Sequence, residues 1–258
     1  MVTKELKTVI KISTQTGKLM LESGAETYRV EDTVQRMIAS KGAYDVNVFV
    51  IPTGIMLSVV HEDEVITLLE RAKPEGIDLE TIDRANEFSR RFTNDNMSLA
   101  SAELELLTLL NPPKFRKCIR ILASGMAGGF FVLLFGGSTI EFALAFIASA
   151  LTVLMTDEID SKHLNFFIKN IIGGFVATLS SILLVTLTRT VGMNAAVNMV
   201  IIGPLMMLVP GVSLTNGIRD LISGELLAGS AKIMEALFIA IALAFGVGIV
   251  LQFSLKLI

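Results

Sequence analysis

The sequence predicts a membrane all-α bundle of five transmembrane helices preceded by a cytosolic α+β domain. The chain has 258 residues, of which 52% are hydrophobic and 18% charged, whereas ordinary soluble domains carry about 25% charged residues. Charge is also uneven, because only 7 of the 22 Lys and Arg and 7 of the 25 Asp and Glu follow residue 117. Five long apolar stretches also follow residue 117. The uneven charge and these stretches together predict a cytosolic domain at residues 1–113 and a transmembrane domain at 114–258.

The cytosolic domain is predicted to begin with two helices. Apolar residues recur at helical spacing from residue 4 to 22, and Gly24 is suited to end that helix. Ser23 and Glu26 have the spacing of an S-x-x-E capping box. A second helix is therefore expected to begin there and to stop near Gly42.

The hydrophobic pattern then alternates, which indicates strands. A three-stranded meander is expected at residues 46–51, 55–60 and 65–69, with turns at 52–54 and 62–64. Helices are expected to follow at roughly 79–92 and 99–110. Pro112-Pro113 should close the domain, because proline cannot continue a helix.

No catalytic or metal-binding constellation stands out. The run from His61 to Glu64 lacks the second histidine of a helical H-E-x-x-H site, since position 65 is Val65 and the other histidine is the distant His163. No nucleophile triad, phosphate-binding loop or basic patch is recognisable, which disfavours an enzyme, a cofactor or metal site, and nucleic-acid binding. The single cysteine, Cys118, cannot form an internal disulfide and is expected to pack at a membrane edge.

Five apolar stretches are long enough to cross about 30 Å of hydrocarbon, which takes about 20 residues of helix. They are expected to be helical because unpaired backbone groups are costly in lipid. The spans are predicted at about residues 119–135, 140–156, 171–187, 195–214 and 236–255.

Small residues predict how these spans pack, and basic residues predict their orientation in the membrane. Small residues four apart let helices approach closely in lipid, and they occur as Gly125 and Gly129, Gly173 and Ala177, and Ala240, Ala244 and Gly248. Lys and Arg mark the cytoplasmic side and crowd the start of the first span. We therefore expect a protein of the cytoplasmic membrane with its N-terminus on the cytoplasmic side and its C-terminus on the external side.

The fourth predicted span carries Gly203-Pro204 and Pro210-Gly211. One interpretation is a plain kink, because proline is common in transmembrane helices. The other is a broken helix whose free backbone groups bind a substrate or an ion, as in secondary transporters. The sequence alone leaves both open.

Three segments resemble one family of membrane proteins. Residues 23–37 (SGAETYRVEDTVQRM) and 46–59 (VNVFVIPTGIMLSV) are similar to the cytosolic domain of the threonine/serine exporter family. Residues 209–236, from Val-Pro-Gly to Glu-Ala, are similar to the signature after that family's fourth span. The resemblance covers nearly the whole chain and implies efflux of a small carboxylate-bearing metabolite.

The chain departs from full-length family members, which have roughly twice as many spans. It resembles the larger subunit of split systems, in which a second, smaller membrane protein supplies the remaining spans. Some split systems are described as exporting dicarboxylates such as succinate, so threonine, serine and a dicarboxylate all stay open as substrates. The leading hypothesis is thus a subunit of a secondary efflux transporter, driven by protons or another electrochemical gradient because no nucleotide-binding motif is present. The alternative is a membrane-anchored sensor or enzyme that acts through its cytosolic domain.

The candidate substrate-binding residues are Pro210, Gly211, Ser213, Asn216, Arg219 and Asp220. Pro210-Gly211 should end one half-helix, and Ser213 or Thr215 is suited to cap the next, whose amides would then face a carboxylate. Asp220 would bind the ammonium group of an amino acid, whereas Arg219 would bind the second carboxylate of a dicarboxylate. The alternative is that Arg219 and Asp220 merely mark the cytoplasmic boundary.

A second candidate is the acidic pair Asp157 and Glu158, at the cytoplasmic end of the second span. Ionisable residues at membrane depth are usually functional, which favours a role in proton coupling or gating. The alternative is that both carboxylates simply lie in the membrane interface.

Overall fold

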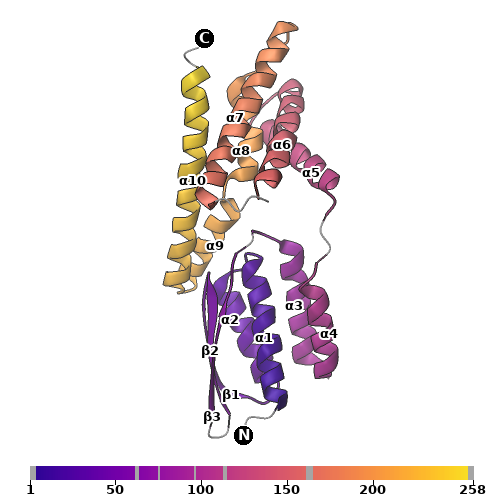
Figure 1. Ribbon diagram of the computed structural model, residues 1–258, viewed down its shortest axis with the longest axis vertical. Coiled ribbons are helices and arrows are strands. Elements are labelled where there is room, and N and C mark those ends of the chain that lie inside the picture. The colour runs from indigo at the N-terminus through magenta and orange to yellow at the C-terminus, as the bar shows by residue number, and fades with distance from the viewer. Residues whose placement is uncertain are drawn as a thin grey trace. The chain divides into compact units, whose positions relative to one another are not determined.

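The computed structural model describes residues 4–61, 64–74, 76–95, 97–112, 115–160 and 165–254, without the Asp160 side chain. The chain forms two compact units, and each unit combines two segments that are not adjacent in the sequence (Figure 1). Unit 1 comprises residues 1–113 and 212–234, and unit 2 comprises residues 114–211 and 235–258. A segment that follows the fourth predicted span therefore packs with the N-terminal region.

Unit 1 begins with two packed helices, α1 (Lys4–Glu22) and α2 (Thr27–Ala39). α1 ends at Gly24 as predicted, because the φ of +88° at Gly24 turns the chain so that the Gly24 and Ala25 amides bond back to the last turn of the helix. The predicted capping box is wrong: α2 begins only at Thr27, and Glu26 at its N-cap makes no side-chain capping bond. The Glu26 carboxylate is thereby available to other partners.

The three-stranded meander is confirmed. Strands β1 (Tyr44–Ile51), β2 (Gly54–His61) and β3 (Glu64–Arg71) pair antiparallel in the order β1-β2-β3. Alternation along the strands puts Val50, Ile55 and Leu57 on the buried face. Phe49 and Leu69 lie on the opposite face and are exposed.

Unit 1 is layered. Helices α1 and α2 lie between the sheet and a second helix pair, α3 (Leu79–Asn94) and α4 (Leu99–Leu109) (Figure 1). The side chains of Asp78 and Ser98 cap α3 and α4. Phe88 and Phe92 of α3 are fully buried in the core between the layers, and such large apolar side chains contribute most of the burial free energy.

Unit 2 is a helix bundle of α5 (Lys117–Leu134), α6 (Thr139–Asp160), α7 (Phe166–Thr190), α8 (Val197–Leu208) and the part of α10 (Leu226–Ser254) from Glu235 onwards. Helix α8 packs against α5, α6 and α7. In the described ranges, α5, α6, α7 and α10 are each long and apolar enough to cross a membrane. The interrupted pair of α8 and α9 (Gly211–Ile222) gives a fifth span if it counts as one.

The fourth predicted span, at about residues 195–214, is a broken helix, which is one of the two interpretations that the sequence left open. Helix α8 ends at Leu208 and α9 begins at Gly211, so the interruption falls at Val209 and Pro210. Pro204 lies inside α8 without ending it. Since α9 starts at Gly211, neither Ser213 nor Thr215 caps it, contrary to expectation.

Glycines set the closest helix contacts in unit 2. A Cβ atom added at Gly125 of α5 would lie 2.9 Å from the Phe146 ring of α6. A Cβ at Gly246 of α10 would lie only 2.1 Å from the Ile171 carbonyl oxygen of α7. Gly248, which belongs to the small-residue pattern noted in the sequence, has nothing within 4 Å of its Cβ position. The α7–α10 contact therefore uses a different glycine from the predicted one.

Some residues used in the sequence analysis lie outside the described residues. They are Glu62, Asp63, Pro113, His163 and the C-terminal residues 255–258.

Candidate functional site: a polar cluster on the α1–α2 turn

A polar cluster in unit 1 joins the turn between α1 and α2 to α9 and the start of α10. It consists of the turn residues Gly24, Ala25, Glu26 and Thr27 and the side chains of Asn216, Arg219, Asp220 and Lys232. This set is called the turn cluster below. Each of the four consecutive turn residues contacts one of these later side chains.

Two of the contacts come from the exposed half of the cluster. The Asn216 side-chain Nδ2 donates to the Gly24 carbonyl oxygen at 2.9 Å. The Arg219 Nη1 lies 2.9 Å from Glu26 Oε1 and forms an ion pair with it. Asn216 and Arg219 are three residues apart, so both side chains come from one face of α9.

The other two contacts are buried. Lys232 Nζ donates to the Ala25 carbonyl oxygen at 3.0 Å and lies 2.9 Å from Asp220 Oδ2. Asp220 Oδ1 accepts a hydrogen bond from the Thr27 backbone N–H at 3.0 Å. The Asp220 side chain is fully buried and that of Lys232 is nearly so.

Burial of a carboxylate and an ammonium is costly unless both are paired and hydrogen-bonded. Here the two charges neutralise each other. Asp220 also accepts from the first amide of α2, where the positive end of the helix dipole favours an anion. Asp220 is therefore a buried link between α9 and the N-terminus of α2.

The close approach of α9 and α10 depends on two glycines. A Cβ at Gly229 would lie 2.7 Å from the Gly217 carbonyl oxygen, and a Cβ at Gly217 would lie 3.1 Å from the Gly229 carbonyl oxygen. A reversal at Gly224, with a φ of +94°, connects the two helices. This packing brings Lys232 to Asp220.

Glu26 is the second buried carboxylate of the turn cluster, with a side chain 7% exposed. Besides Arg219, it pairs with Arg29, whose Nη1 lies 3.3 Å from Glu26 Oε2. Burial alone would raise the pKa of Glu26, but a hydrogen bond from its own backbone N–H and the two guanidinium groups outweigh burial and lower the pKa below 4.5. The carboxyl group is therefore ionised at neutral pH.

Helix α9 has an inverted pattern of burial. Its polar Asp220 is buried and Asn216 is half-buried, whereas Leu214, Ile218 and Ile222 are exposed on the other side. A water-exposed helix shows the opposite arrangement. The exposed apolar side is suited to contact lipid or another protein.

The turn cluster brings together only part of the predicted substrate site. It includes Asn216, Arg219 and Asp220, while Pro210 lies in the interruption before α9, and Gly211 and Ser213 lie in its first turn.

From the sequence, Glu26 was expected only in a capping box, and Lys232 was not among the predicted site residues. The scarcity of charge after residue 117 was the available signal for Lys232.

The acidic pair lies at the end of α6 in unit 2. Asp157 forms an ion pair with Arg120 of α5, with 2.6 Å between Oδ1 and Nη2. The Asp157 side chain is 14% exposed, and Glu158 is exposed. One carboxylate of the acidic pair thus forms an ion pair between two predicted spans.

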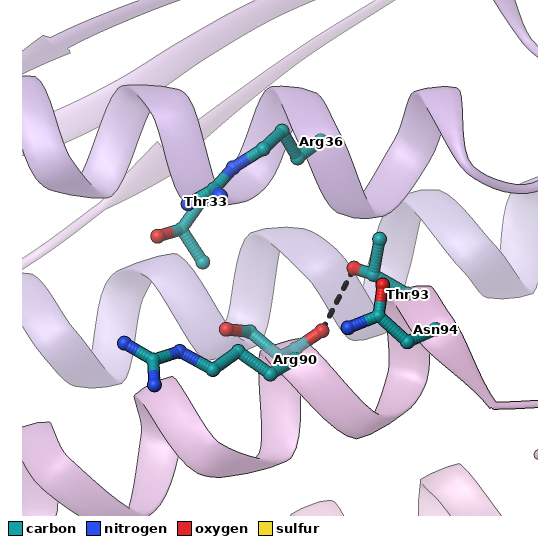
Figure 2. A pocket seen from close by; sticks show the side chains of 6 residues that line it. Thr33, Arg36, Arg90, Thr93 and Asn94 are labelled. Carbon is teal, nitrogen blue, oxygen red and sulfur yellow. Dashed lines mark hydrogen bonds between the residues drawn. The ribbon is translucent and has the colours of Figure 1, made fainter.

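A small pocket between α2 and α3 is lined by Thr33, Arg36, Ser89, Arg90, Thr93 and Asn94 (Figure 2). The Thr93 hydroxyl donates a hydrogen bond to the Ser89 carbonyl oxygen, drawn as the dashed line in Figure 2. The pocket has a volume of about 60 Å³. Sites that enclose organic ligands usually measure about 300–1,000 Å³, so this pocket is too small to enclose a metabolite.

The long apolar helices and the interrupted fourth span indicate a multi-pass membrane protein. A family profile described as "Putative threonine/serine exporter" matches residues 11–254. The chain belongs to this threonine/serine exporter family, as its resemblance had implied. Family membership places it among transporters and not among enzymes.

Three relatives refine this placement. A threonine/serine exporter of Corynebacterium glutamicum is 28% identical over 144 residues, which are 56% of this chain and 29% of that protein. The "Probable succinate transporter subunit YjjP" of Escherichia coli (strain K12) is 23% identical over 252 residues, covering 96% of this chain and 95% of that protein. The protein of the same name from Klebsiella aerogenes is 23% identical over 248 residues, covering 94% and 93%. The matched region is thus under a third of the corynebacterial exporter but nearly all of each YjjP protein.

No solved structure matches the chain.

Proposed function

We propose that the chain is the larger subunit of a secondary exporter that moves a small dicarboxylate, such as succinate, out of the cytoplasm. The observation that carries this proposal is the nearly end-to-end similarity to two proteins named as succinate transporter subunits. The shorter match to a threonine/serine exporter keeps threonine and serine as the alternative substrates.

We propose that the substrate path passes the segment from Pro210 to Asp220. Helix α8 ends at Leu208 and α9 begins at Gly211, and helix breaks of this kind mark substrate and ion sites in secondary transporters. Arg219 supplies a guanidinium group, which matches the geometry of a carboxylate. Gly211 and Ser213 begin the helix that carries it.

For the coupling or gating step, we propose Asp157 and Glu158. Asp157 is mostly buried and paired with Arg120, so a proton added to its carboxyl group would weaken a contact between two predicted spans. Asp157→Asn should therefore flatten the pH dependence of efflux. Unchanged pH dependence in both Asp157→Asn and Glu158→Gln would remove the pair from consideration.

A second membrane subunit is part of the proposal, because the relatives of equal length are named as subunits. The test is efflux of radiolabelled succinate or threonine from preloaded cells that express this chain, a neighbouring small membrane protein, both or neither. We expect succinate efflux only when both are present. If cells with both proteins export neither compound, the proposed function is contradicted. If they export threonine but not succinate, the substrate is an amino acid and not a dicarboxylate.

A further inference from the structure

We propose that Arg29 and Arg219 form the receptor for one carboxylate of the exported dicarboxylate, and that the Glu26 side chain occupies this receptor while no substrate is bound. This inference rests on the proposed function and deepens it. Glu26 would be an internal stand-in for the substrate.

The geometry is that of a carboxylate held by two arginines from different helices. Arg29 belongs to the first turn of α2 and Arg219 to the second half of α9. They contact different oxygens of Glu26, at 3.3 Å and 2.9 Å, through one nitrogen each. A guanidinium group has five N–H donors, so each arginine retains donors beyond these contacts.

The two arginines remain accessible although Glu26 does not. The side chains of Arg29 and Arg219 are 40% and 59% exposed, against 7% for Glu26. An incoming carboxylate can therefore reach both guanidinium groups before Glu26 leaves them. Exchange of one carboxylate for another then needs no step in which the arginines lack an anionic partner.

Charge favours a dicarboxylate over an amino acid at this place. Two arginines and one glutamate leave a net charge of +1, while Asp220 and Lys232 neutralise each other. A dianion is attracted by this excess, whereas a zwitterionic amino acid carries no net charge to be attracted.

The tethered position of Glu26 explains why the receptor would be occupied at rest. Glu26 belongs to the same chain, so its effective concentration at the arginines is high without substrate. A free carboxylate competes with it only at sufficient concentration. Removal of the Glu26 charge should therefore strengthen substrate binding, which a purely structural ion pair would not do.

The test is calorimetric titration of succinate and, separately, threonine into the purified full chain in lipid nanodiscs. Glu26→Gln should lower the Kd for succinate at least tenfold, and Arg29→Gln and Arg219→Gln should each raise it at least tenfold. Arg36→Gln is the matched control, since Arg36 lies on the same helix as Arg29 and is paired with Asp32; its Kd should equal that of the wild type. Threonine should bind more weakly than succinate to every variant.

An unchanged Kd for succinate in Arg29→Gln and Arg219→Gln would overturn the inference, as would weaker binding in Glu26→Gln. If cells still export succinate in that case, the proposed function stands and only the receptor is wrong. Arg219→Lys provides a second variant in case Arg219→Gln does not fold. Lysine keeps the positive charge but lacks the planar guanidinium group, so the Kd of Arg219→Lys for succinate should rise above that of the wild type by less than the Kd of Arg29→Gln does. A Kd equal to that of the wild type would again contradict the proposed receptor.

Discussion

Among the described residues of unit 1, Asp220 and Lys232 form the most buried ion pair, and its contribution to stability can be measured by breaking it. Lys232→Met should destabilise the protein by about 3–5 kcal/mol, because it leaves the Asp220 carboxylate buried without its counter-charge. The measurement is thermal unfolding of the detergent-purified chain. Lys11→Met, at an exposed position of α1, should change the stability by less than about 0.5 kcal/mol.

The double variant Asp220→Leu with Lys232→Met removes both charges and should recover much of the loss, since apolar replacement of a whole buried pair is often neutral. A double variant as unstable as the sum of the two single ones would show that the two charges do not act as a pair.

Glu31 of α2 should make the stability of unit 1 depend on pH. Burial raises its pKa above 4.5, the nearby Glu225 carboxylate raises it further, and a hydrogen bond from the Val50 backbone offsets only part of this. The folded state then binds the proton more tightly than the unfolded state, so this contribution to stability is present below pH 4.5 and is lost as the pH rises through the raised pKa.

Glu31→Gln should consequently raise the Tm at pH 7, by about 1–2 °C because the side chain is only partly buried, and should leave it unchanged at pH 4. Glu103→Gln, at an exposed position of α4, is the control and should behave alike at both pH values. A lower Tm for Glu31→Gln at pH 7 would contradict the predicted sign.

At the scale of helices, α10 offers a matched pair of glycines two residues apart. Gly246→Ala would place a Cβ against the α7 backbone at Ile171, and overpacking of this kind costs about 1–3 kcal/mol. Gly248→Ala meets nothing within 4 Å and should be neutral or slightly stabilising, since alanine is the better helix former. The Tm of the two purified variants distinguishes them, and equal values would mean that α7 and α10 do not pack as described.

At the scale of the whole molecule, the predicted orientation can be tested by cysteine labelling. Cys118 is exposed and is the only cysteine in the sequence, so Cys118→Ser gives a background for single cysteines. Thr190→Cys, at the exposed end of α7, should react with an impermeant maleimide in intact cells. Ser40→Cys, after α2, should react only once the membrane is opened. The reverse pattern would place the N-terminal region outside.

Local sequence patterns predicted most of the elements. Alternation between Val46 and Val60 indicated strands, and the scarcity of charge after residue 117 indicated membrane helices, because both signals depend only on which side chains water or lipid accepts. The boundaries were less accurate: α2 begins at Thr27 and not at the S-x-x-E pattern, because after the Gly24 reversal the Glu26 carboxylate pairs with Arg29 and Arg219 and makes no capping bond.

The sequence by itself thus determined the class of the protein, its family and the position of the broken span. Only the tertiary structure decided which polar groups meet. The turn cluster joins residues 192 to 207 positions apart, and no period or spacing reports such a pairing. It arises because Gly217 and Gly229 let α9 and α10 pack closely, so that the buried charges of Asp220 and Lys232 find each other and the first amide of α2.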